Sequence, residues 1–195
     1  MGMKIKQIGS SAVFDATDGI TGDIPLADND PQRQTYSIFF PAFVPAAAPT
    51  DILQIQGSAT KIVKIRSIVM TGTATAASII IPTIVRRSTI ATGGSPTITP
   101  FAKRDPNNLN PSAVLTTFAA APTSVGTLIA TVDGGRLSVA PAANGGIDRL
   151  LLQYTWLNEQ GLTLRGVNDF ICINLGGAAF PAGGAMDVQI YMTEE

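Results

Sequence analysis

The side chains of this chain that could do chemistry are mainly carboxylates near its N-terminus. Five of its eleven aspartates lie in the first 30 residues: Asp15, Asp18, Asp23, Asp28 and Asp30. Carboxylate oxygens are the ligands that calcium prefers in proteins, but this spacing matches no EF-hand loop. We therefore interpret the segment as a solvated acidic stretch, and we expect no metal or other cofactor.

The lack of histidine removes most of the usual catalytic sites. A chain without imidazole cannot form Ser-His-Asp or Cys-His catalytic groups, nor the common zinc and iron sites. The single cysteine, Cys172, cannot form an internal disulfide and is expected to be a small buried side chain in the run 170–173. Aspartate, lysine or tyrosine could still act in an enzyme, but the composition favours a protein that is not one.

Phosphate and nucleic-acid ligands are also disfavoured. The chain has no GxxxxGK[ST] loop, and no GxGxxG lies between a strand and a helix. With 13 basic and 14 acidic residues the net charge is −1, whereas phosphate binding requires a surplus of basic residues. The pairs Arg86-Arg87 and Lys103-Arg104 are not interleaved with aromatic residues, so we interpret them as surface charges or as salt bridges to a partner subunit.

Carbohydrate is an alternative ligand, because β-sandwich domains often bind sugars. Glycoside hydrolysis would need a pair of carboxylates, for which Asp148 and Asp169 are the candidates to test. Only 6% of the residues are aromatic, whereas sugar sites usually display several aromatic platforms. The lone tryptophan, Trp156, is therefore assigned to the core or to an interface.

Short strands separated by Gly and Pro turns are expected from Tyr36 onward. Val63, Ile65 and Val69 are expected on one face of a strand, with charged residues on the other, and alternate residues from Met186 to Met192 share a face in the same way. The predicted strands are 36–40, 52–56, 61–71, 78–85 interrupted by Pro82, 97–101, 113–118, 127–132, 136–139, 150–156, 170–175 and 186–192. Residues 41–50, with three prolines, are expected to be irregular.

These elements predict an all-β fold, an antiparallel two-sheet β-sandwich, with a jelly roll as the preferred form. The sandwich is assigned to residues 36–195. Residues 1–35 are predicted to be an extended N-terminal arm with one short strand, and such arms can become ordered on a neighbouring subunit.

No membrane or secretory segment is expected. The lysines at positions 4 and 6 are not followed by the apolar run of a signal peptide. No stretch approaches the roughly 18 apolar residues of a membrane span. The chain is therefore expected to fold in a cytoplasm.

Low charge predicts that the surface serves in association. Charged residues make up 14% of the chain, against an ordinary value of about 25%, and the mean hydropathy is +0.27. Exposed apolar patches usually mark interaction sites, although an ordinary Ala- and Thr-rich sandwich would explain the composition equally well. The candidate interface residues are Phe39, Phe40, Phe43, Ile5, Ile8 and Trp156. The three phenylalanines could equally plug one end of the sandwich.

Several short stretches resemble a known group of proteins. They are residues 43–61 running into 63–66, then Arg86-Arg87-Ser88-Thr89, Thr92-Gly93-Gly94, Ala121-Pro122-Thr123, Val125-Gly126, Leu164-Arg165-Gly166 and Asn174-Leu175. Together, over residues 40–195, they resemble small β-rich structural proteins of tailed bacteriophage virions. The resemblance implies a virion protein that is made in the host bacterial cytoplasm.

The first functional expectation is a capsid decoration, or cement, protein. Such a protein would bind the major capsid protein or other virion subunits as a homo-oligomer, a trimer being one option, and would bridge neighbouring capsid subunits. A tail, head-fibre or baseplate component with receptor-binding loops is the alternative. A carbohydrate-binding β-sandwich is the second alternative.

Overall fold

The computed structural model describes residues 4–6, 13–15, 33–46, 48, 50–141, 143, 148–154 and 161–195. The chain divides into two compact units, Met1–Gln32 and Arg33–Glu195. The first contains an antiparallel pair of short strands, β1 (Lys4–Lys6) and β2 (Val13–Asp15), where one strand was expected. The extended character of this segment stays a prediction.

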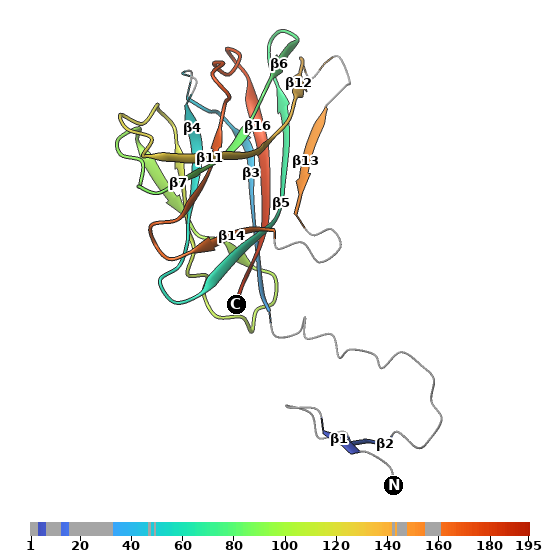
Figure 1. Ribbon diagram of the computed structural model, residues 1–195. Coiled ribbons are helices and arrows are strands. Elements are labelled where there is room, and N and C mark those ends of the chain that lie inside the picture. The colour runs from blue at the N-terminus through green and yellow to red at the C-terminus, as the bar shows by residue number, and fades with distance from the viewer. Residues whose placement is uncertain are drawn as a thin grey trace. The chain divides into compact units, whose positions relative to one another are not determined.

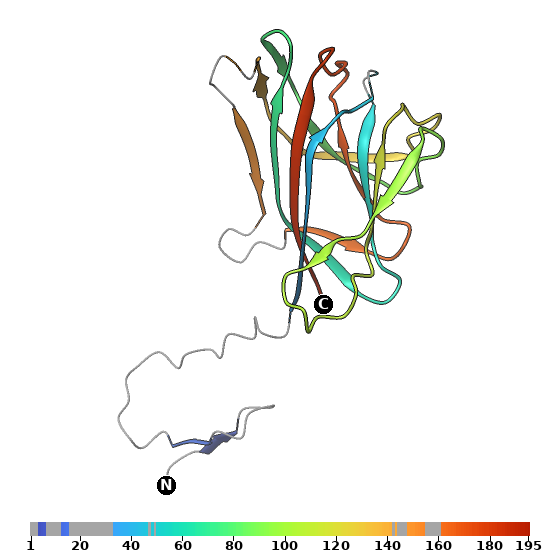
Figure 2. The ribbon, with the colours of Figure 1, turned by 180° about the vertical axis from the view of Figure 1, so that it is seen from behind.

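The second unit is an antiparallel β-sandwich, which confirms the predicted fold class. Each of its two main sheets has six strands. Figures 1 and 2 show their arrangement from opposite sides. Sheet 1 has the order β13 (Arg149–Gln153), β5 (Ile62–Thr73), β16 (Ala185–Glu194), β3 (Gln34–Phe43) and β9 (Ala102–Lys103), and β14 (Leu162–Arg165) also pairs with β5. Sheet 2 has the order β11 (Leu128–Gly134), β7 (Thr83–Arg87), β15 (Phe170–Asn174), β4 (Asp51–Gln56), β10 (Val114–Phe118) and β8 (Pro96–Thr99).

The principal strands alternate between the two sheets, except that β7 and β11 follow one another within sheet 2. Eight principal strands follow one another as β3, β4, β5, β7, β11, β13, β15 and β16. Numbered 1 to 8 in that order, they lie side by side as 1-8-3-6 in sheet 1 and 2-7-4-5 in sheet 2. A separate two-stranded ribbon of β6 (Ser78–Ile80) and β12 (Leu137–Val139) completes the fold.

The core lies between the sheets and is built from alternating apolar residues. On β16 the inward side chains, from Met186 to Met192, are fully buried, while the residues between them are half-buried on the outer face, as predicted. Ile52, Leu53 and Ile55 of β4 and Ile171 and Ile173 of β15 meet them from sheet 2. Alternation fixes the register, because a one-residue slip would expose the whole apolar face.

β-Bulges account for two expectations that were wrong. The pairing of β5 with β16 shifts between Tyr191 and Met192, so Val69 leaves the core face that Val63 and Ile65 occupy. The strand β3 does not end before Pro41 but continues to Phe43, because a second bulge accommodates the proline. A prediction that continues one alternation through the whole strand misses a bulge. One inserted residue moves every later side chain to the opposite face of the sheet.

Other differences concern strand limits. The predicted strand 78–85 is two strands in different sheets, because Pro82 ends the first of them and cannot donate to a ladder. The predicted strand 150–156 is described only as β13, which ends at Gln153. The short strands β2, β9 and β14 were not expected.

Candidate interaction surfaces

The three phenylalanines proposed for an interface lie on different sides of β3. Phe39 points to the outer face of sheet 1 and is 55% exposed. Phe40 and Phe43 are half-buried against the core, with their ring centroids 6.4 Å apart. Only Phe39 therefore presents its ring to solvent, while the other two rings close one part of the core.

The remaining candidates fall outside the described side chains. Ile5 belongs to β1, of which the backbone alone is described. Ile8 and Trp156 lie outside the described residues, as do the acidic positions 18, 23, 28 and 30. Their interface or ligand roles stay predictions.

The end strand β11 exposes apolar side chains along its length. Leu128, Ile129 and Val132 are 54%, 57% and 39% exposed. The pairing of β11 with β7 shifts twice, which leaves Ile129 and Val132 outside the ladder. Edge strands are usually protected by charged side chains, proline or β-bulges, and β11 has two bulges and Asp133 but neither lysine nor proline. This strand is therefore an apolar edge of the described sandwich.

The opposite end strand of sheet 2, β8, is different. Ile98 is exposed there, but Pro96 begins the strand and Pro100 follows it. Proline lacks the amide donor that a docking strand would use, so it blunts an edge. Of the two edges of sheet 2, the β11 edge therefore favours association with another strand, whereas prolines disfavour it at the β8 edge.

The outer face of sheet 2 carries a buried ion pair. Arg87 donates from Nε and Nη2 to the two carboxylate oxygens of Asp51 at 2.6 and 2.9 Å, and Asn174 donates to the same carboxylate at 2.6 Å. Burial lowers the pKa of Arg87, but the hydrogen bond and charge of Asp51 outweigh it, so the pKa is raised. Asp51 and Arg87 are both buried, so the pair is shielded from water and salt.

Part of the chain covers this ion pair. Arg87 donates from Nη1 to the carbonyl of Gly126 at 3.2 Å, and the amide of Ala91 donates to Gln54 on the same face. Beneath them Val85, Phe170 and Cys172 form a second small core. Burial, and then the charge of Asp51, raise the pKa of the Cys172 thiol, which keeps it protonated and unreactive.

Arg86 and Arg87 are thus not free surface charges, because each forms an ion pair within the chain. Arg86 donates to both oxygens of Asp169 at 2.8 and 2.7 Å, within the same chain. Arg104 of the second pair lies 5.1 Å from the ring centre of Tyr191, a cation–π distance. The prediction for residues 86–87 was wrong because their partners lie far away in the sequence.

The two carboxylates considered for glycoside hydrolysis have structural partners. Asp169 binds Arg86 and also accepts a hydrogen bond from the amide of Arg165 at 3.0 Å. Asp148 accepts hydrogen bonds from the amides of Ser138 and Arg149 at 3.0 and 2.8 Å. Asp148 joins β12 to the start of β13, Asp169 holds the turn after β14, and neither is among the residues that line the depression described below.

A second buried carboxylate ties the last strand to the loop before β10. Glu194 accepts hydrogen bonds from the amides of Ser112 and Ala113, both at 2.8 Å, and from Lys61 at 3.1 Å. Burial and the charge of Glu194 raise the pKa of the neighbouring Tyr36. This set anchors β16, which is the central strand of sheet 1.

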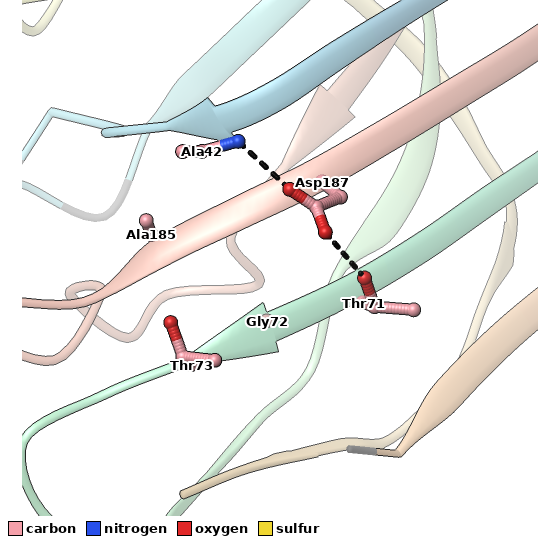
Figure 3. A pocket seen from close by; sticks show the side chains of 6 residues that line it. All are labelled: Ala42, Thr71, Gly72, Thr73, Ala185 and Asp187. Carbon is pink, nitrogen blue, oxygen red and sulfur yellow. Dashed lines mark hydrogen bonds between the residues drawn. The ribbon is translucent and has the colours of Figure 1, made fainter. Parts of the chain in front are cut away.

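The outer face of sheet 1 contains a depression of about 270 Å³. It is lined by Phe39, Val69, Thr71, Arg149, Asp187 and Gln189. A smaller hollow of about 70 Å³ adjoins it and shares Thr71 and Asp187, with Ala42, Gly72, Thr73 and Ala185 as its other walls (Figure 3). The two hollows together run across β3, β16, β5 and β13.

Asp187 is held firmly in this depression. Its Oδ1 accepts a hydrogen bond from the amide of Ala42 at 2.7 Å, and its Oδ2 accepts one from the Thr71 hydroxyl at 3.3 Å (Figure 3). Ala42 has a φ of 50°, in the left-handed region that a residue with a Cβ adopts at a cost of about 1–2 kcal/mol. The carboxylate thus compensates the bulge in β3 and takes a fixed position.

The alternation of polar and apolar residues along β16 predicts that Asp187 and Gln189 lie on its outer face, but it does not indicate a binding site there. Thr71 and Arg149 carried no signal, because their positions beside Asp187 depend on strand pairing far along the chain.

Within the described part of the chain, no three His, Cys, Asp or Glu side chains lie close enough together to hold a metal ion. The described residues also include no helix that could span a membrane. Comparisons of the chain with protein-family models, curated proteins and solved structures give no match.

Proposed function

We propose that the chain is a structural protein of a tailed-phage virion, and specifically a capsid decoration protein. The observation that carries the proposal is the apolar edge of β11, where Leu128, Ile129 and Val132 are exposed without a protecting lysine or proline. Exposed apolar side chains along an edge without lysine or proline favour association with another polypeptide. The resemblance of residues 40–195 to virion proteins supplies the kind of partner.

The strand order supports the same proposal. The orders 1-8-3-6 and 2-7-4-5 are those of a double Greek key, so we infer that the sandwich is a jelly roll. Jelly rolls occur in viral capsid domains and in lectins, so the fold alone does not select a function. It does provide a rigid body on which a docking edge keeps a fixed position.

The mechanism is the burial of apolar surface on the shell. Stable protein interfaces bury roughly 1,600 Å² in total, and a homo-oligomer such as a trimer multiplies the contacts that each particle site receives. The major capsid protein is the proposed partner. No catalytic step is part of this function.

The substitution Ile129→Lys tests the docking edge. Full-length protein is mixed with particles that lack it, and the bound fraction is measured by sedimentation. We expect wild-type protein to bind and Ile129→Lys to bind at least tenfold more weakly, because a lysine on the edge disfavours docking. Val167→Lys is the matched control, since Val167 is exposed outside β11.

Copy number tests the position in the virion. Quantitative mass spectrometry of purified particles should find hundreds of copies for a shell protein, whereas a tail, head-fibre or baseplate component would give about a dozen. Absence of the chain from the particles would disprove the proposal. Unchanged binding of Ile129→Lys would disprove the role of β11.

A further inference from the structure

The depression on the outer face of sheet 1 combines apolar and polar groups in a small space. Its volume of about 270 Å³ is near the lower end of the roughly 300–1,000 Å³ of small-molecule sites. A single ring-sized ligand therefore fits it better than a large one. The proposed role of β11 concerns a different sheet, so the two proposals stand independently.

The polar groups lie in a row across three strands. Thr71 of β5 pairs directly with Asp187 of β16 and with Arg149 of β13. Neighbouring strands are about 4.8 Å apart, so the carboxylate and the guanidinium start from positions about 10 Å apart. An acceptor and a donor thus flank a hydroxyl, at a spacing that suits the hydroxyl groups of one sugar ring.

The second row supplies the apolar side. Gln189 of β16 pairs with Phe39 of β3 and with Val69 of β5. The ring of Phe39 is more than half exposed, whereas Val69 is almost fully buried and forms part of the floor. An exposed aromatic ring beside an amide offers stacking to the C–H face of a pyranose and hydrogen bonds to its edge.

These polar groups retain capacity for a ligand. A carboxylate can accept about four hydrogen bonds, and the two accepted by Asp187 come from Ala42 and Thr71. Thr71 uses its proton in that contact and keeps its lone pairs. Among the described residues, the Arg149 guanidinium forms no ion pair.

Other ligand classes fit less well. A peptide strand cannot be added here, because β16 and β5 already pair on both sides and have no free edge. A nucleic acid would need several basic residues, and this depression has one beside a carboxylate. A metal ion would need more ligands than the single carboxylate.

We propose that this depression is a carbohydrate site that binds one pyranose residue of a glycan. Phe39 stacks on the sugar ring, Asp187 and Gln189 accept from its hydroxyls, and Arg149 donates to a hydroxyl or to a sugar carboxylate. The adjoining hollow of about 70 Å³ has room for a substituent such as a hydroxymethyl or acetamido group.

A glycan array tests the site with full-length protein. The array carries short glycans of glucose, galactose, mannose, N-acetylglucosamine and glucuronic acid, and hits are confirmed by NMR titration. We expect at least one hit, and we expect Phe39→Ala to weaken its affinity by roughly tenfold. Arg149→Gln should also weaken it, with the larger effect on glycans that contain glucuronic acid.

Leu151→Ala is the matched control. Leu151 pairs with Val69 and is exposed on the same face, but it does not line the depression, so affinity should not change. An array without hits for folded wild-type protein would overturn the proposal. Hits that both Phe39→Ala and Arg149→Gln retain at wild-type affinity would overturn it as well.

Discussion

The outer faces of the two sheets differ in what covers them. On sheet 2 the segments around Ala91 and Gly126 lie against the buried pair of Asp51 and Arg87. On sheet 1 the corresponding face leaves Phe39 and Leu151 exposed. Both faces use polar side chains, but on sheet 2 they bind one another, whereas on sheet 1 several keep hydrogen-bonding capacity. Sheet 2 therefore contributes stability from both sides, and sheet 1 keeps one side for recognition.

Removal of the buried cation should have the largest effect. Arg87→Ala leaves the Asp51 carboxylate buried without its cationic partner, which typically lowers the free energy of unfolding by about 3–5 kcal/mol. Chemical denaturation followed by circular dichroism measures the loss. The replacement also opens space beside Cys172, which further lowers the free energy of unfolding.

Arg33→Ala is the control for that measurement. Arg33 pairs with Glu195 at 3.1 Å, but its side chain is 44% exposed, so the loss should stay within about 1 kcal/mol. If Arg87→Ala were as mild as Arg33→Ala, the outer face of sheet 2 would not be the stabilising layer described above.

The same contrast separates what the sequence could predict from what it could not. The inward face of β16 follows from the alternation at Met186 and Val188, because one sheet face is buried over a long strand. The partner of Arg87 does not follow, since Asp51 is 36 residues away and no local pattern joins them. Long-range pairs require the sheet topology, which periodicity alone does not supply.

For a related reason, only part of the candidate depression could be predicted from the sequence. The polar positions on β16 indicated an outer face, but the approach of Arg149 depends on the pairing of β13 with β5. The orientation of Val69 was wrong because of a bulge that no residue type announces. Alternation thus predicts faces, whereas neighbours across the sheet come from the topology.

The next largest effect is expected from alkaline pH, which should lower the free energy of unfolding through the buried Cys172 on the outer face of sheet 2. Burial, and then the charge of Asp51, raise the pKa of Cys172 above its ordinary 9.0, so the unfolded chain loses the thiol proton first. Stability from this group is complete below pH 9 and falls above it, at about 1.4 kcal/mol for each pH unit. Free energies of unfolding measured between pH 8 and 10 should show this decline.

The variant Cys172→Ala identifies the group responsible. Burial raises the pKa of Tyr154 above its ordinary 10.0, with a further contribution from the charge of Asp133, and burial also raises that of Tyr36. In the unfolded chain these tyrosines lose their protons about one pH unit higher than the thiol, so they lower stability only at higher pH. The variant should therefore keep a nearly constant free energy of unfolding from pH 8 to about 9.5. A decline parallel to that of the wild type would show that Cys172 is not its source.

The smallest change in the free energy of unfolding is expected on the outer face of sheet 1. Phe39→Ala removes a ring that is 55% exposed, so the free energy of unfolding should fall by no more than about 1 kcal/mol. Phe170→Ala deletes the same ring from the covered face, where Phe170 is 2% exposed, and should cost about 3–5 kcal/mol. Chemical denaturation of the two variants under identical conditions compares the faces directly. Equal losses would mean that Phe39 stabilises the sandwich, and its exposure would then no longer favour a binding role. A small loss would leave the ring free for a ligand, because a side chain that adds little to folding can be placed by what it binds.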